Sequence, residues 1–222
     1  MRAPLVVVAA AMFLAGCGGD PTPSPRAPCP TQAPTSTSAQ ATLADAGFAT
    51  VTMIGAVEGE FVIELNGDAA PITTANFVEL ARCGFYDGIN FHRVLAGFVI
   101  QAGDPNTRGR VGDFTGIGRG GAGYDYEIEP PAENLGYDQY SVAMANDTRT
   151  NDSQFFVSLV DLNQGLQRLY TIFGQVVSGT EVVDAIAAVP VLDPRLGIPA
   201  VPVTIASVVV TESGGVEASP SS

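Results

Sequence analysis

The chain has 222 residues, of which 46% are hydrophobic and 15% are charged, so it can form one sizeable domain with a compact core. Acidic residues outnumber basic ones 23 to 10, which gives a formal net charge of −13. A surface of this sign repels the phosphates of nucleic acids, and we expect no nucleic-acid partner.

The first 17 residues, MRAPLVVVAAAMFLAGC, have the features of an export signal. Arg2 supplies a positive start, and the apolar run from Leu5 to Leu14 is shorter than the roughly 20 residues that span a membrane. The run ends in LAGC, which resembles a bacterial lipobox, whose cysteine is lipidated. The alternative is an ordinary secretory signal with a cysteine there by chance. We predict a lipoprotein signal peptide over residues 1–17, with Cys17 as the lipid anchor of an extracytoplasmic protein.

Pro, Ser, Thr, Ala and Gln dominate residues 18–44, which cannot bury a core and predict a disordered linker. Residues 212–222 predict a flexible tail. One folded domain then extends over residues 45–211, and we expect it to act as a monomer.

Two cysteines remain besides the predicted anchor. Cys29 lies in the predicted linker and Cys83 near the end of a predicted helix. In an oxidising compartment they can form a disulfide, but nothing in the sequence decides whether they do. No CxxC motif or Cys/His cluster occurs, so we predict no metal site.

Strand signals dominate the domain. Phe61, Ile63 and Leu65 alternate with Val62 and Glu64, the pattern of a half-buried strand. We predict strands over 48–54, 59–67, 140–145, 153–160, 170–177 and 204–211, and helices over 70–84 and 178–190. Many short strands with two helices indicate a β-barrel or a sandwich with helical caps.

The stretch GIGRGG, residues 116–121, matches the dinucleotide pattern GxGxxG. That fingerprint needs a strand before it and a helix after it. Here YDYEIEPP follows, which cannot begin a helix. We interpret the stretch as a loop and predict no nucleotide or other cofactor.

FHRVLAGFVIQAGDP, residues 91–105, holds the only histidine, His92, beside Arg93. Strand alternation places the two side chains on opposite faces. A histidine general base usually needs an orienting carboxylate and a nucleophile, and neither is adjacent, so we interpret His92 as structural and bonded to loop backbone. Arg93 lies among apolar residues, with Gln101 as the next polar side chain. This pair can donate hydrogen bonds to a carbonyl or an amide.

The same stretch resembles the signature of the cyclophilins, the peptidyl-prolyl cis-trans isomerases. The segments 70–94, 141–159 and 170–186 resemble further parts of that family in family order, so the likeness covers roughly residues 50–189. It implies a mainly β fold, a closed eight-stranded antiparallel β-barrel capped by two α-helices. It also implies isomerisation of Xaa-Pro bonds, and the predicted export signal directs this activity to exported polypeptides.

The resemblance implies a role for each site residue. Arg93 donates to the prolyl nitrogen, and Phe98 and Gln101 complete the catalytic set. The remaining substrate-binding residues line the proline pocket or contact the peptide backbone, and they are Val99, Ala145, Asn146, Gln154, Phe156, Leu166 and Tyr170. An alternative function is a non-catalytic module that holds proline-containing segments in the same groove.

Overall fold

A computed structural model describes residues 26–110 and 116–212 of the chain. The predicted signal peptide with Cys17, the first part of the predicted linker and the tail beyond residue 212 lie outside this range. No helix within it is long and apolar enough to cross a membrane.

The helices are α1 (Ser36–Leu43), α2 (Pro71–Cys83), the 3₁₀ turn η1 (Pro105–Thr107) and α3 (Thr180–Ala187). The strands are β1 (Phe48–Gly55), β2 (Gly59–Leu65), β3 (Arg93–Leu95), β4 (Val99–Ala102), β5 (Tyr126–Glu127), β6 (Ser141–Asn146), β7 (Thr150–Ser158), β8 (Ile172–Ser178), β9 (Val191–Asp193), β10 (Ile198–Pro199) and β11 (Val203–Thr211).

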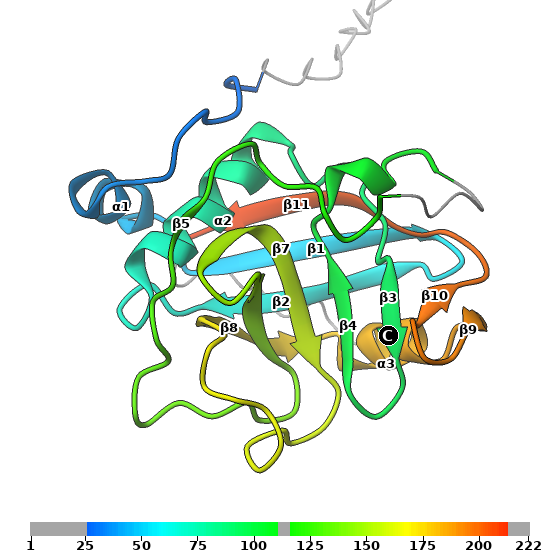
Figure 1. The fold of residues 1–222 in the computed structure, drawn as a ribbon. Helices are drawn as coiled ribbons and strands as arrows, with labels where there is room; N and C mark the ends of the chain where they lie inside the picture. The colour runs from blue at the N-terminus through cyan, green and yellow to red at the C-terminus, as the bar shows by residue number, and fades with distance from the viewer. Residues whose placement is uncertain (1–25, 111–115, 213–222) are drawn as a thin grey trace, which may run out of the picture.

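One curved antiparallel sheet dominates the fold (Figure 1). Eight of its strands follow the order β11-β1-β2-β8-β6-β7-β4-β3, and β5 pairs with β7. Side chains alternate along these strands, so that Ala49, Val51 and Met53 of β1 are buried while the residues between them are partly exposed. All six strands predicted from sequence periodicity are present, which confirms the mainly β class.

The sheet is an open half-barrel, so the expected closed barrel is wrong. Its end strands, β3 and β11, do not form a ladder with each other. The segment just before β3 contacts β11 through an isolated bridge between Asn90 and Thr204 and through a few backbone hydrogen bonds, such as that from the Phe91 amide to the Val203 carbonyl at 2.8 Å. The free edge of β3 instead receives the β9–β10 hairpin, where the Val94 amide donates to the Gly197 carbonyl at 2.6 Å. The hairpin satisfies backbone groups that β11 would have to satisfy in a closed barrel.

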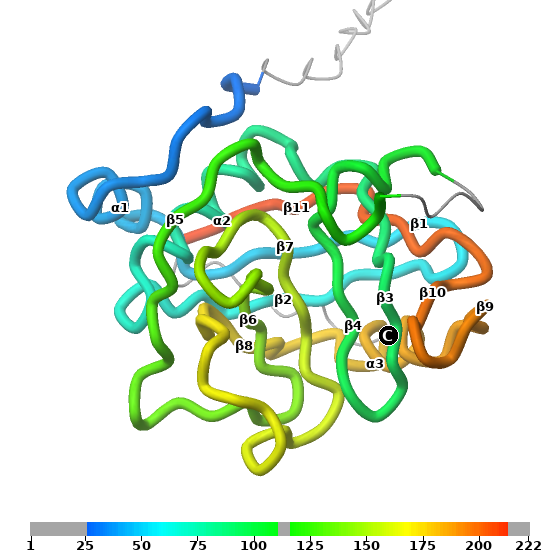
Figure 2. The backbone as a smooth tube through the Cα atoms, in the orientation of Figure 1, coloured from blue at the N-terminus to red at the C-terminus, as the bar shows by residue number. Residues whose placement is uncertain are grey.

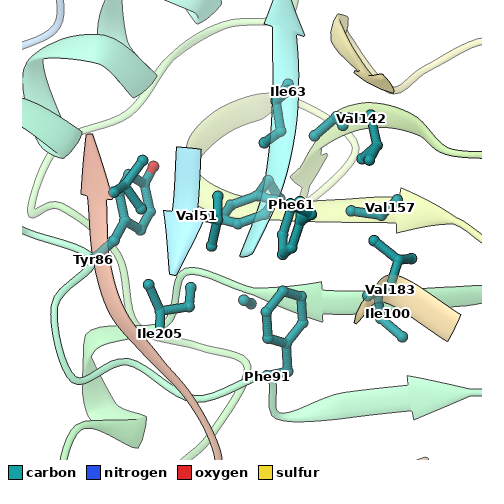
Figure 3. Close-up of a cluster of buried hydrophobic side chains, with 14 of the residues drawn as sticks. Val51, Phe61, Ile63, Tyr86, Phe91, Ile100, Val142, Val157, Val183 and Ile205 are labelled. Atoms are coloured by element: carbon teal, nitrogen blue, oxygen red, sulfur yellow. The ribbon is translucent and has the colours of Figure 1, made fainter. Parts of the chain in front are cut away.

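The core lies inside this curved sheet (Figure 3). Phe61 and Ile63 from β2 meet side chains from the other strands there, with Tyr86 and Phe91 at its margin. The helices α2 and α3 both bury side chains in the same core, and they lie at opposite ends of it in Figure 1. They are the two expected helices, and their packing closes the apolar interior that the open sheet leaves accessible.

Helix α2 begins and ends as its sequence predicts, with Pro71 in the first turn and Gly84 in the left-handed conformation after the last. Its N-terminus has no side-chain cap of its own. Glu129, from the segment before β6, accepts hydrogen bonds from the amides of Ile72 and Thr73 at 3.0 and 2.7 Å. A carboxylate far along the chain therefore caps this helix and offsets its dipole.

Part of the predicted disordered linker is structured, so that prediction is wrong for residues 36–43. They form α1, where the side chains of Thr35 and Ser38 cap each other's backbone amides. Helix α1 packs against α2, and Thr42 donates to Glu79 at 2.8 Å. A disulfide also joins Cys29 to Cys83 at the end of α2, which settles the pairing left open above. Composition alone misses α1 because tertiary contacts and a cross-link stabilise it.

Candidate active site

Arg93 and Gln101 lie opposite each other in the β3–β4 ladder. The Arg93 guanidinium donates to Gln101 Oε1 at 3.3 Å, and its Cζ lies 5.8 Å from the centre of the Phe98 ring. Phe98 is the last residue of the β3–β4 turn and is half-buried. The three residues predicted to form the catalytic set are therefore brought together by one short hairpin, whose register is local in sequence.

A chain of amide hydrogen bonds fixes this arrangement. Gln101 Nε2 donates to Gln154 Oε1 at 3.0 Å, and Gln154 Nε2 donates to the Gly120 carbonyl at 2.8 Å. Each amide has one orientation that satisfies both of its neighbours, so the Gln101 oxygen must face Arg93. The half-buried guanidinium is thus held in place with donor groups to spare.

The predicted pocket residues gather in a second hydrophobic cluster beside Arg93, here called the apolar cluster. Its buried members are Val99, Tyr137, Ala143, Phe156, Leu162 and Ile172, and its partly buried members are Leu135, Phe98, Ala145, Leu166 and Tyr170. The rings of Phe156 and Tyr170 pack edge to face, with centroids 5.4 Å apart. The partly exposed side chains of the cluster form an apolar surface above its buried members. Such a surface can bind an apolar ring such as that of proline.

Tyr137 is a residue of this cluster that the sequence analysis missed. Its hydroxyl accepts from the Tyr170 amide at 3.0 Å and donates to the Tyr170 carbonyl at 2.9 Å. These two bonds hold Tyr170 against the cluster. No local pattern marks Tyr137, because its role depends on a contact with a distant loop.

A cavity of about 340 Å³ lies on the β7 side of Gln101. Four predicted residues line it, namely Gln101, Ala145, Asn146 and Gln154. The Asn146 amide donates to the Leu169 carbonyl at 2.8 Å, so this side chain also holds the loop before β8. The structure thus gives Asn146 a positioning contact in addition to its place at the cavity wall.

The same cavity is acidic, and we call it the acidic cavity. Asp125, Asp147 and Asp152 line it, against one basic residue, Arg119. Asp152 Oδ1 accepts from the Ala122 amide at 2.6 Å, and burial raises the pKa of Asp152. Sequence analysis missed these aspartates, which come from two loops and from β7.

The glycine-rich loop of residues 116–121 forms part of this wall. Asp104 accepts a hydrogen bond from the Gly118 amide, and Gln154 donates to the Gly120 carbonyl. The loop contains turns and is not followed by a helix. The interpretation as a loop is therefore confirmed. Side chains from elsewhere in the chain, Asp104 and Gln154, hold this loop in place.

His92 is buried, but not as expected. Neither ring nitrogen makes a hydrogen bond of normal geometry with the described residues. The nearby Asn90 backbone opposes the effect of burial on the His92 pKa, because it favours the protonated ring. Burial lowers the pKa of His92 to about 4, so the ring is neutral at pH 7. His92 lies just before β3, and both His92 and Arg93 line one hollow there.

Among the residues that the structure describes, no group of three or more His, Cys, Asp or Glu side chains is placed to hold a metal ion. The site itself presents the hydrogen-bonding side chains of Arg93, Gln101 and Gln154 beside the apolar cluster. Such a site can hold an amide and its substituents and change their electronic state without forming a covalent bond.

Comparison with known proteins agrees with this geometry. The family model for cyclophilin type peptidyl-prolyl cis-trans isomerase/CLD matches residues 49–210. The peptidyl-prolyl cis-trans isomerase-like 1 of Rhizopus delemar is 43% identical over 130 residues, which cover 56% of this chain and 72% of that protein. The isomerase ppi1 of Schizosaccharomyces pombe is 43% identical over 129 residues, covering 56% and 76%.

Two solved structures of a Cryptosporidium parvum cyclophilin type peptidyl-prolyl cis-trans isomerase are also similar. The first superposes with a TM-score of 0.64 and 28% identity, covering 76% of this chain and 99% of that one. The second, determined in the presence of the dipeptide Ala-Pro, gives 0.63 and 29%, covering 75% and 99%. The family match begins at residue 49, so it carries no information on the N-terminal segment.

Proposed function

Since this chain belongs to the cyclophilin-type peptidyl-prolyl cis-trans isomerases and is an enzyme of that kind, we propose that Arg93 supplies the hydrogen bond on which its reaction depends. In this proposal the guanidinium donates to the prolyl nitrogen while the proline ring rests on Phe98 and Phe156 of the apolar cluster. The similar structure determined with Ala-Pro supports a proline-containing peptide as the ligand.

The reaction requires rotation about a tertiary amide, whose resonance creates a barrier of roughly 18–20 kcal/mol. Without a catalyst the rotation takes tens to hundreds of seconds. A donor to the prolyl nitrogen favours the pyramidal nitrogen that has lost conjugation with the carbonyl. Every step is a change of conformation. The site therefore needs a hydrogen-bond donor in a fixed position and a surface that holds the proline ring of the substrate, and it needs no nucleophile.

The magnitudes are consistent with this role. Raising the rate from ~0.01 to ~10 per second requires about 4 kcal/mol. A hydrogen bond from a charged donor contributes roughly 1.5–3 kcal/mol. Arg93 therefore supplies a large part of the effect, and Gln101 together with the apolar cluster supplies the rest through orientation and desolvation.

The observation that carries this proposal is the hydrogen-bonded row from Arg93 through Gln101 to Gln154, beside the apolar cluster. The test is the rate of cis-trans exchange in a Xaa-Pro peptide, measured with wild type and with Phe156→Ala. We expect Phe156→Ala to raise KM more than it lowers kcat. An unchanged KM would contradict binding of the proline ring at Phe156.

We further propose that the enzyme acts outside the cytoplasm on exported proteins, as a monomer anchored through lipid on Cys17. The signal-like residues 1–17 support the anchor. The Cys29–Cys83 disulfide supports an oxidising compartment, where such bonds persist. The expected sedimentation behaviour of the domain without residues 1–17 is that of a monomer.

The anchor is tested by expressing the full chain and its Cys17→Ser variant in a bacterium that processes lipoproteins. Wild type should incorporate labelled palmitate and fractionate with membranes, and Cys17→Ser should lose the label. Globomycin blocks signal-peptide cleavage after lipidation, so it should make a larger, labelled precursor accumulate. A wild-type chain that takes up no lipid label would refute the anchor and leave the isomerase activity untouched.

A further inference from the structure

A second hollow, of about 430 Å³, lies on the outer side of β3. It shares Arg93 and Gln101 with the candidate active site and includes no residue of the apolar cluster. Its far wall comes from the β9–β10 hairpin, through Arg195, Leu196 and Ile198. We call this hollow the basic cleft.

The hairpin that forms this wall is firmly held against β3, beside which it runs in Figures 1 and 2. Its Gly197 carbonyl accepts from the Val94 amide at 2.6 Å. A Cβ atom at Gly197 would lie 2.5 Å from the Val94 carbonyl oxygen, and φ there is +69°, so only glycine allows this approach. Arg195, two residues earlier, is thereby placed across the cleft from Arg93.

The charge of the cleft is opposite to that of the whole chain. Among the described residues, two arginines and no carboxylate line it, whereas the whole chain carries −13. His92 also lines the cleft and is neutral at pH 7 because burial lowers the pKa of that ring. Gln101 separates the basic cleft from the acidic cavity, which three aspartates line. The surface is therefore positively charged on one side of Gln101, in the basic cleft, and negatively charged on the other, in the acidic cavity.

The Arg195 guanidinium is available for a ligand. In the described part of the chain it takes part in neither of the ion pairs, Arg26–Asp87 and Arg82–Asp45. The nearest acid in sequence, Asp193, instead accepts from the backbone amides of Arg195 and Leu196 at 2.7 and 3.2 Å. Leu196 is 58% exposed beside it, so the wall offers an apolar contact as well as a charge.

From this charge complementarity we infer that the basic cleft is a subsite for an acidic side chain of the substrate, next to the proline, with Arg195 as its specificity-determining residue. The inference rests on the proposed function. A peptide lying over Gln101 with its proline on the apolar cluster extends into the cleft at one end only. An aspartate or glutamate at that end pairs with Arg195, while a lysine is repelled by both arginines.

The test uses full-length enzyme and matched peptides that carry Glu, Gln or Lys immediately before or immediately after the proline. We expect wild type to favour Glu over Gln at one of these two positions by about 1.5-fold to fivefold in kcat/KM, the range for a solvent-exposed ion pair, because Arg195 is exposed. Arg195→Gln should abolish that ratio, Arg195→Lys should retain most of it, and Arg195→Glu should favour Lys. High salt should reduce the ratio in wild type.

Gln40→Glu is the matched control, because it changes the net charge by the same amount as Arg195→Gln on the exposed side of α1. It should leave both the activity and the Glu/Gln ratio unchanged. An unchanged ratio in Arg195→Gln, or an equal loss of the ratio in Gln40→Glu, would overturn the inference. Activity of the Gln peptide is measured separately, so failure of the isomerase mechanism and failure of the subsite are distinguishable.

Discussion

Replacement of Arg93 by alanine separates a catalytic contribution from a structural one. The side chain is half-buried at the edge strand β3, with one hydrogen bond to Gln101 at 3.3 Å and a ring contact with Phe98. Losing these contacts should reduce the free energy of unfolding by no more than about 1 kcal/mol. Losing a charged donor to the prolyl nitrogen should cost roughly 1.5–3 kcal/mol in the transition state, or about 10- to 150-fold in kcat/KM.

The assay is NMR exchange spectroscopy of a Xaa-Pro peptide, which reports isomerisation without a coupling enzyme, together with thermal unfolding of each variant. Arg93→Lys should give a smaller loss because the charge remains without the planar fork. Gln101→Ala should also reduce kcat/KM, and its effect should be less than additive with Arg93→Ala because both act through one guanidinium. A folded Arg93→Ala enzyme with kcat/KM within twofold of wild type would refute the mechanism.

The remaining predictions concern stability. Replacing Cys29 and Cys83, 54 residues apart, by serine should lower the free energy of unfolding by about 4 kcal/mol on the loop-entropy account, and urea melts of equal midpoint would contradict this. Burial lowers the pKa of His92 from 6.5 to about 4, so as the pH falls this ring takes up its proton in the unfolded chain before it does so in the folded chain. Stability should therefore be full above pH 6.5 and fall by up to about 3 kcal/mol towards pH 4; parallel pH curves for wild type and His92→Gln would refute it. Gly103→Ala should cost more than about 1 kcal/mol, because φ is +97° and the new Cβ would lie 2.4 Å from the Ser153 carbonyl oxygen; an unchanged denaturation midpoint is the contrary result.

Local patterns in the sequence determined six of the strands of this protein and the helices α2 and α3. Alternating side chains predicted β1 and β2, and Pro71 and Gly84 marked the ends of α2, because each signal depends on neighbours within one element. Arg93, Phe98 and Gln101 were named together because residues 91–105 resemble the cyclophilin signature, and their closeness in space follows from their closeness in sequence. A three-residue turn joins two short strands, and that turn sets which side chains face each other.

Only the tertiary structure decided how the distant parts meet. The open edge of the sheet, the folding of α1 onto α2 and the pairing of Cys29 with Cys83 depend on contacts between segments far apart in the chain. The basic cleft has the same origin, since Arg195 lines the same cleft as Arg93 because Gly197 docks its hairpin on β3. Periodicity and turn chemistry act over a few residues, whereas these contacts arise from packing of the whole chain around one core.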